Sequence, residues 1–148
     1  MAHFAELESK IDPTGFTSDT HLVVKRVIVV DNAHVESDEH VSGENWCSTF
    51  FGGCTWKQTS YNNKFRKRYA GIGTIYDAAK NKFLHQQPYA SWSLDADDNW
   101  QAPVTYPAGD QSEYGISWDE AGRQWTGIKE SDESKWNWDA SGLAWVSA

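Results

Sequence analysis

The sequence lacks every motif that would bind a phosphate, activate a nucleophile or hold a catalytic metal. There is no P-loop, no Gly-x-Ser-x-Gly elbow, no His-Glu-x-x-His helix and no Gly-rich dinucleotide fingerprint. The five histidines are scattered, and the paired carboxylates Asp97-Asp98 and Asp119-Glu120 fall in expected turns, where acidic residues are common. A glycosidase-type acid/base pair is the alternative interpretation of these carboxylates. We predict a protein that is not an enzyme, with no catalytic residue and no cofactor.

Cysteine and long apolar runs are also scarce. The two cysteines, Cys47 and Cys54, do not make a disulfide framework, and a reduced pair is expected in a cell. The sequence has no run of 18 apolar residues, no signal peptide and no lipidation motif. These absences support neither membrane insertion nor export by a signal peptide.

Leucine, isoleucine and valine are in short supply, whereas aromatic residues are abundant. The 148 residues include nine Trp, six Tyr and six Phe, so these rings must supply most of the core. Wide aromatic side chains suit thin sheets and hairpins, where one ring covers several backbone atoms. A chain of this length forms one domain or two small halves.

One short pattern recurs four times in the second half of the chain. Each copy has an apolar residue, then Asp, then an aromatic residue five or six positions after the Asp, and successive copies start 18, 24 and 20 residues apart. Such repetition indicates similar supersecondary units. The copies are Tyr76-Asp77 to Phe83, Leu94-Asp95 to Trp100, Trp118-Asp119 to Trp125, and Trp138-Asp139 to Trp145.

The chemistry of one copy predicts a β-hairpin. Asp119 can accept hydrogen bonds from nearby backbone amides to start a turn, and Gly122 can finish it at positive φ. In that register Trp118 and Trp125 lie diagonally on one sheet face. Gly142 plays the same part in the last copy, and Asn81 and Asn99 replace the glycine in the first two. We predict four consecutive hairpins, near 75–84, 92–101, 116–126 and 136–146.

The first half reads as an antiparallel sheet with one helix. We expect strands at 2–8, anchored by Phe4 and Leu7, and at 22–30, the most β-prone run and the central strand. A helix is expected near 43–51, with Ser42 as its cap and a stop at Gly52-Gly53. Further strands are expected at 55–60 and 64–70, joined by a turn at 62–63. The predicted fold is mainly β, with an N-terminal β domain at 1–74 and a hairpin-repeat region at 75–148.

Charge is distributed unevenly along the chain. Residues 75–148 hold 5 basic and 12 acidic side chains, whereas residues 1–74 hold 8 and 9. No acidic residue lies between Glu44 and Asp77, and the expected strand at 64–70 would place Lys64, Arg66 and Arg68 on one face. A solvated basic strand is the simplest interpretation, and a partner-binding surface is the functional one.

An acidic segment at 33–44 raises the question of a metal site. Carboxylates and imidazoles are metal ligands, but no spacing here matches a zinc or EF-hand pattern, so we predict no metal site. The residues concerned are His34, Glu36, Asp38, Glu39, His40 and Glu44.

Two binding chemistries remain open from the residues alone. Exposed Trp and Tyr rings on the hairpins could stack on sugars, although rings that pack against one another are more common. The basic segment with Phe65 and Tyr69 could grip single-stranded nucleic acid, but the acidic remainder would repel phosphates. The candidate partner-binding residues are Lys64, Arg66, Arg68, Trp118, Trp125, Trp138 and Trp145.

The order of several segments resembles a group of small Trp/Tyr-rich proteins from tailed phages, especially marine phages and cyanophages. The segments are MAHFAELE, VIVVDN, FFGGCTWKQTSYNNKFRKRYAGIGTIYD, PYASWSLDADDNWQAPVTYP and YGISWDEAGRQW. The chain departs from the group at Cys54, in a longer loop at 9–20 and in an extra unit at 136–145. The resemblance implies a virion-associated structural protein, either a capsid decoration or a tail or tail-fibre component.

The expected partners are therefore other phage virion proteins, with self-association as a further contact. A glycan-binding module that recognises host surface polysaccharide is the alternative function. We expect no nucleic-acid partner and no membrane contact.

Overall fold

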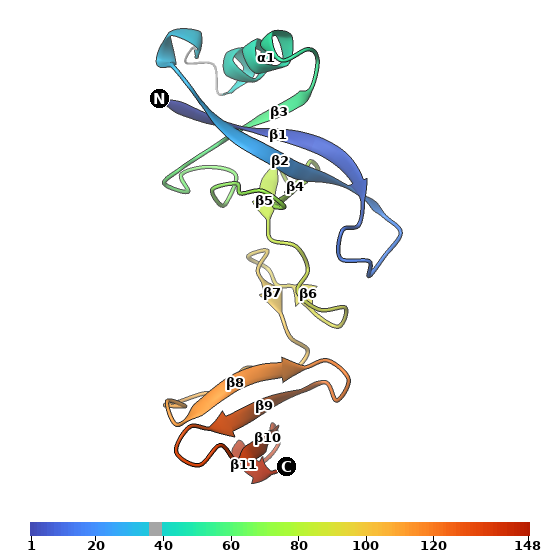
Figure 1. Ribbon diagram of the computed structural model, residues 1–148, viewed down its shortest axis with the longest axis vertical. Coiled ribbons are helices and arrows are strands. Elements are labelled where there is room, and N and C mark those ends of the chain that lie inside the picture. Colours follow the sequence, from blue (N-terminus) through green and yellow to red (C-terminus); the bar gives the residue numbers. More distant parts are fainter. Residues whose placement is uncertain (36–39) are drawn as a thin grey trace. The chain divides into compact units, whose positions relative to one another are not determined.

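The structure is a computed structural model that describes residues 1–35 and 40–148. The chain forms two compact units, unit 1 at Met1–Gln86 and unit 2 at Gln87–Ala148 (Figure 1). Strands make up 40% of the chain and helices 9%, which confirms the mainly β class. Glu36, Asp38 and Glu39 of the predicted acidic loop lie outside the described residues.

Unit 1 is built on a five-stranded antiparallel sheet in the order β3-β1-β2-β4-β5. The long strands β1 and β2 form its centre, and β2 is the middle strand, as its apolar sequence predicts. The strands are β1 (Ala2–Ile11), β2 (Thr20–Val30), β3 (Thr55–Thr59), β4 (Ile75–Asp77) and β5 (Lys82–Leu84).

A bulge in β2 places Val24 and Val30 on opposite faces of this sheet, each in one of two buried clusters. Glu6 pairs with Arg26 and Leu7 pairs with Val24, so Lys25 has no partner on β1. One buried cluster lies on each face, and Phe4 and Leu7 belong to different clusters. The first cluster is Ala5, Leu7, Val24, Ala70, Tyr76 and Phe83; the second is Ala2, Phe4, Val30, Cys47 and Trp56.

The α-helix α1 (Val41–Phe50) contributes Cys47 to the second cluster, and a short 3-10 helix, η1 (Asn32–His34), precedes it. The predicted cap at Ser42 is wrong. The helix starts at Val41, two residues before the predicted start at 43, and His40, at φ 87°, occupies the cap position without a side-chain cap bond. Its ring Nδ1 instead lies 2.7 Å from Gln58 Oε1 on β3. The predicted end is right, because Gly52 and Gly53 follow at positive φ.

Residues 64–70 do not form the predicted returning strand. Arg66 and Lys67 take left-handed φ angles of 51° and 69°, which breaks the alternation of side chains on which that prediction depended. The turn before them is as predicted, because Asn63 N donates to Ser60 O at 3.0 Å. The segment is held by tertiary bonds: Phe83 N donates to Arg66 O, and Ala70 N donates to Thr59 Oγ1.

Arg66 in this segment and Glu44 in α1 bond backbone groups on the two edge strands of the unit 1 sheet. On β3, Gln58 N donates to Glu44 Oε1 and Gln58 O accepts from Arg66 Nη1 at 2.9 Å. On β5, Phe83 N donates to Arg66 O at 3.0 Å. Arg66 therefore satisfies backbone groups on both edge strands, and these groups are not open to another chain.

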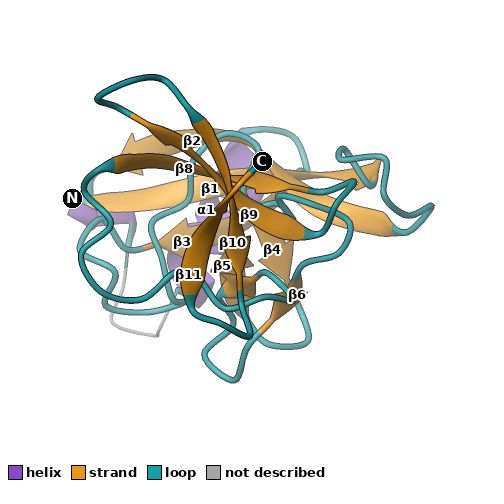
Figure 2. Ribbon diagram, turned by 90° about the horizontal axis from the view of Figure 1, so that it is seen from below, coloured by secondary structure: helices purple, strands orange, loops and turns teal. Residues whose placement is uncertain are grey.

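Unit 2 contains three of the four predicted hairpins (Figures 1 and 2). A two-stranded ribbon is followed by a four-stranded antiparallel sheet in the order β11-β10-β9-β8. The strands are β6 (Ser93–Leu94), β7 (Trp100–Gln101), β8 (Tyr114–Asp119), β9 (Gln124–Lys129), β10 (Lys135–Asp139) and β11 (Ala144–Ser147).

The first predicted hairpin, β4–β5, belongs to unit 1. Leu22 of β2 pairs with Tyr76, and Val23 pairs with Ile75, so this hairpin extends the first sheet. The division between the units therefore falls after residue 86, whereas the sequence pattern placed it after residue 74. The repeat pattern describes the hairpin itself and carries no information about which sheet the hairpin joins.

In three of the four turns the Asp carboxylate accepts backbone N–H groups as predicted, at Asp77, Asp95 and Asp139. Asp119 accepts instead from the Gln124 side chain at 3.4 Å, and the glycines act differently from the prediction. Asp139 Oδ1 accepts from Ser141 N and Gly142 N, each at 3.1 Å, and an added Cβ on Gly142 would lie 2.5 Å from Asp139 Oδ2. Glycine is needed there because the carboxylate occupies the space of a side chain. The residue with positive φ is the next one, Leu143, at 53°.

The same correction applies to the other turns. In the third hairpin Arg123, and not Gly122, has positive φ, and Trp118 pairs directly with Trp125 in place of the predicted diagonal. Asn81 has positive φ as predicted, but Asp98 takes this role in the second hairpin in place of Asn99.

Candidate functional site

The four predicted partner-binding tryptophans form the core of unit 2. Trp118, Trp125 and Trp138 are buried, and Trp145 is half-buried against them. The ring centroids of Trp118 and Trp125 are 5.0 Å apart, and those of Trp138 and Trp145 are 5.2 Å apart, both in edge-to-face geometry. Rings packed in this way leave little surface for a partner.

A connecting segment, residues 103–108, is held against this aromatic core. Trp125 Nε1 donates to Val104 O at 2.9 Å, and the Tyr106 ring packs edge-to-face on Trp125 with centroids 5.0 Å apart. These two contacts position the segment beside the sheet, so that it forms a second wall opposite the β10–β11 hairpin.

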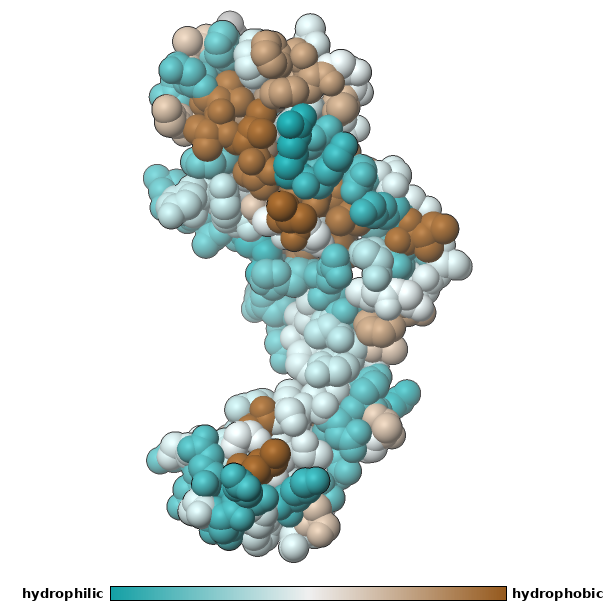
Figure 3. Space-filling model, viewed as in Figure 1, coloured by the Kyte–Doolittle hydropathy of each residue, from teal (hydrophilic) through white to brown (hydrophobic). Residues whose placement is uncertain are grey.

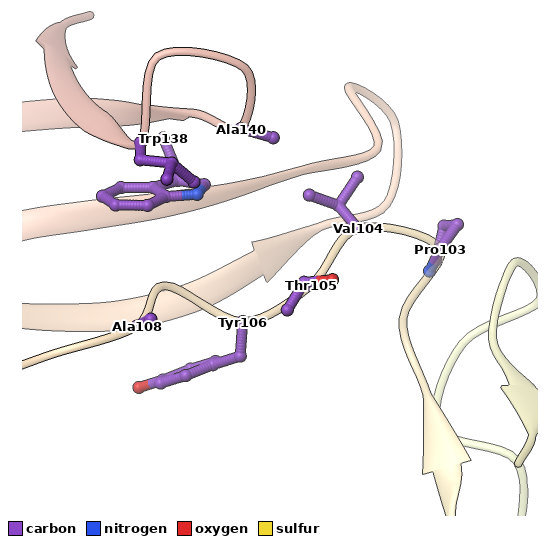
Figure 4. Close-up of a pocket in the computed structure, with 8 residues that line it drawn as sticks. Pro103, Val104, Thr105, Tyr106, Ala108, Trp138 and Ala140 are labelled. Atoms are coloured by element: carbon purple, nitrogen blue, oxygen red, sulfur yellow. The ribbon is translucent and has the colours of Figure 1, made fainter.

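Between the segment and the hairpin lies a cavity of about 460 Å³, which we call the apolar groove. Figure 4 shows Trp138 and Ala140 on the hairpin side, with Val104 and Thr105 on the facing segment. The groove is lined by Pro103, Val104, Thr105, Tyr106, Ala108, Trp138, Ala140 and Leu143.

The side chains that line the groove are apolar or carry hydroxyl and indole groups. No carboxylate, imidazole, thiol or amine is among the described side chains that line it, and its side-chain polar groups are the hydroxyls of Thr105 and Tyr106 and the indole N–H of Trp138. Tyr106 and Leu143 are 55% and 72% exposed, so apolar surface continues from the groove to the outside. Such a surface can accept an apolar side chain from another molecule.

Unit 2, which contains this groove, carries a large negative charge. It holds 3 basic and 11 acidic side chains, a net charge of −8, whereas unit 1 holds 10 of each. In Figure 3 the visible face of unit 2 is coloured mainly from hydrophilic to intermediate, with small hydrophobic areas. Hydrogen bonds from the Ser141 side chain and from the Gly142 and Ser141 amides lower the pKa of Asp139, so this carboxylate beside the groove stays charged in mild acid.

The predicted basic surface on unit 1 is not assembled as the sequence suggested. Lys64 is exposed and Arg68 is half-buried, but the side chain of Arg66 is only 7% exposed. Arg66 Nη1 lies 2.6 Å from Glu44 Oε1, and its Nε donates to Asn81 Oδ1 at 2.8 Å. Arg66 is therefore a structural ion-pair partner, and the three cations do not share the face of one strand.

The structure offers no feature of a metal or thiol site in the part of the chain that it describes. No group of three or more His, Cys, Asp or Glu side chains there could hold a metal ion. Both cysteines are free thiols. Burial, with a contribution from Glu44, raises the pKa of Cys47 to about 11, and a hydrogen bond with Glu6 raises the pKa of Cys54. Neither thiol has the low pKa of a nucleophile.

Sequence reasoning did not find the apolar groove. Its residues come from the 103–108 segment and the last hairpin, which are separated by two strands. Two features of the sequence could have indicated the groove. They are the Pro-Val-Thr-Tyr-Pro run and the apolar Leu143 in a turn, where a polar residue is usual.

No helix among the described residues is long and apolar enough to cross a membrane. Comparison of the chain with protein-family models, with curated proteins and with solved structures finds no match.

Proposed function

We propose that this chain is a non-enzymatic structural protein of a tailed-phage virion, in the capsid decoration or in the tail or tail fibre, and that unit 2 is its main contact surface. The observation that supports a binding role is the apolar groove, which is open to the outside and lies in a unit with a net charge of −8. The phage context comes from the resemblance described above.

The groove suits a side chain of a partner protein. Protein interfaces depend on a few apolar or aromatic side chains that fill pockets, surrounded by polar residues that exclude water. Trp138 and Val104 supply an apolar floor and wall, and Leu143 supplies an exposed rim. The partner is another virion protein with an apolar anchor.

The charge of unit 2 adds a requirement on that partner. A surface with a net charge of −8 attracts a basic protein surface and repels a nucleic acid. Contact with a second copy through unit 1 is the form of self-association that the charges allow, because unit 1 has no net charge.

A glycan-binding module is the alternative function. The exposed Tyr106 ring favours it, because flat aromatic rings stack on sugars. A sugar also needs several polar groups for its hydroxyls, and the groove offers few. Loss of glycan-array binding in a Tyr106→Ala variant would favour this alternative, and an array without hits would count against it.

Proteomics of gradient-purified particles is the first test of the virion proposal. Copy numbers close to that of the major capsid protein indicate capsid decoration, and a few to a few dozen copies indicate the tail or fibre. A protein that is found in infected cells but is absent from particles would overturn the proposal.

A pair of matched variants tests the role of the groove. Leu143→Asn removes the apolar rim while Asn tolerates the left-handed φ of 53° at this position. Arg123→Asn is the control, because Arg123 occupies the equivalent position of another hairpin at φ 50° and does not line the groove. We expect Leu143→Asn to lower the copy number in particles at least about tenfold, the effect of losing about 1.4 kcal/mol of contact energy. Equal incorporation of both variants would exclude the groove as the contact surface.

A further inference from the structure

The outer edge of β11 is an edge strand without the protection that the unit 1 sheet has. Ala148 N donates to Lys135 O of β10 at 3.1 Å. Because bonded residues alternate along an antiparallel strand, Ala144 and Val146 also bond toward β10, and the backbone groups of Trp145 and Ser147 point away from it. Within the described parts of the chain, no hydrogen bond reaches those outward groups.

The side chains of β11 are not of the kinds that usually prevent an edge strand from pairing with another strand. Edge strands are usually protected by Lys, Pro or an inward charge, whereas β11 reads Ala-Trp-Val-Ser. Ala144, Val146 and Ser147 are exposed. In unit 1, by contrast, Glu44 and Arg66 take up the free groups of Gln58 on the β3 edge.

β11 is also held in place before any partner arrives. The Trp145 ring stacks on Tyr114 with centroids 4.7 Å apart, and its Nε1 donates to Gln111 Oε1 at 2.8 Å. The ring passes so close to Gly127 that an added Cβ there would lie 2.9 Å from it. A pre-formed edge loses little conformational entropy on binding.

We infer that β11 accepts an extended, basic segment of a partner protein as a fifth strand of the unit 2 sheet. The outward N–H and C=O groups of Trp145 and Ser147 bond the incoming backbone, and Val146 meets an apolar side chain on the solvated face. The inference rests on the proposed function, a protein that works through protein contacts, and specifies the chemistry of the contact.

The net charge of unit 2 indicates which kind of chain can pair with β11. Pairing of β11 with the β11 of a second copy would bring together two units that each carry a net charge of −8. A segment in which Lys or Arg alternates with apolar residues meets the same edge with attraction. The occupant is thus a different, basic chain and not a second copy.

Hydrogen exchange of the full-length protein, followed by NMR, tests this inference. The probe is a short synthetic peptide of alternating lysine and valine, and its counterpart with glutamate in place of lysine is the control. With the basic peptide we expect exchange of the Trp145 and Ser147 amides to slow at least about tenfold. The amides of Ala144 and Val146, already bonded to β10, should not change.

Two variants of one residue complete the test. Ser147→Pro removes an outward N–H and leaves the bonds of Val146 and Ala148 to β10, so it should abolish the slowing at Trp145. Ser147→Ala keeps the N–H and should bind like the unmodified protein.

Several outcomes would overturn the inference. The first is that amide exchange on β11 does not slow at saturating peptide, or slows equally with the acidic peptide. The second is that amide exchange slows only on β8. The third is that the exchange of the Trp145 amide is slow in a way that depends only on protein concentration, which would identify a second copy as the occupant. Each leaves the virion proteomics unaffected, so failure of this inference is separate from failure of the proposed function.

Discussion

The clearest test of the fold is Gly43→Ala, because two physical effects predict opposite signs. Gly43 lies inside α1, where replacing glycine by alanine ordinarily stabilises a helix by about 0.8–1.0 kcal/mol. Here an added Cβ would overlap Phe4 Cζ and lie 2.8 Å from Phe4 Cε1. Phe4 is completely buried on β1 and has no room to withdraw.

The cost of the steric overlap should be larger than the gain in helix propensity. Overpacking of a core costs about 1–3 kcal/mol, and an overlap with a fully buried ring belongs at the upper end. After the gain in helix propensity is subtracted, we expect Gly43→Ala to destabilise unit 1 by about 1–2 kcal/mol. Asn45→Ala, at an exposed position of the same helix, should leave stability unchanged or raise it by less than about 0.7 kcal/mol.

The assay must report on unit 1. Seven of the nine tryptophans lie in unit 2, so tryptophan fluorescence is dominated by that unit. Native-state hydrogen exchange of the β1 and β2 amides gives the free energy of opening of unit 1 directly.

A double-mutant cycle separates packing from propensity. In a Phe4→Leu background the ring is gone, so Gly43→Ala should become neutral or stabilising, with a coupling energy of about 2 kcal/mol between the two sites. If Gly43→Ala alone stabilises unit 1 by about 1 kcal/mol, the contact between α1 and Phe4 is refuted.

Three other predictions follow from single contacts. Gly142→Ala should destabilise the last hairpin by about 1–2 kcal/mol, since the added Cβ displaces the Asp139 carboxylate from its backbone donors, and the exchange rates of β10 and β11 amides measure the loss. Arg66→Met should cost about 3 kcal/mol, because Glu44 is left with the weaker partner Lys57 and Gln58 O on the β3 edge loses its bond to the guanidinium; recovery in a double variant with Glu44→Gln is the check, and an unchanged urea midpoint would contradict the assignment. Hydrogen bonds from Thr14, and then from Thr17, lower the pKa of Asp12 to about 2 from 3.8, so its stabilising effect is complete above about pH 4 and is lost as the pH falls toward 2. The stability difference between the unmodified protein and Asp12→Asn should therefore shrink between pH 7 and pH 3, and a constant difference would contradict it.

Local chemistry determined the elements that the sequence predicted well. The four hairpins followed from an Asp and a short polar stretch between apolar residues, and in three of them, at Asp77, Asp95 and Asp139, the carboxylate accepts nearby backbone amides. The central position of β2 followed from its run of β-branched residues, and the end of α1 followed from Gly52 and Gly53, whose positive φ needs no tertiary support.

The tertiary structure decided the features that depend on distant partners. Residues 64–70 have the alternation of a strand, yet bonds with Gln58 and Phe83 hold Arg66 in a left-handed conformation that no local rule predicts. The β4–β5 hairpin has the same pattern as those of unit 2, and only its pairing with β2 places it in unit 1.

The same distinction applies to the candidate site. The sequence identified the tryptophans as the organising residues of the repeats, but an aromatic residue is equally suited to a core and to an interface. Burial of Trp118, Trp125 and Trp138 in one cluster assigned them to the core, and the binding surfaces that we propose are the groove beside Trp138 and the open edge of β11. The sequence alone determined which residues turn and pair locally; which faces and edges remain accessible was decided by packing between segments far apart in the chain.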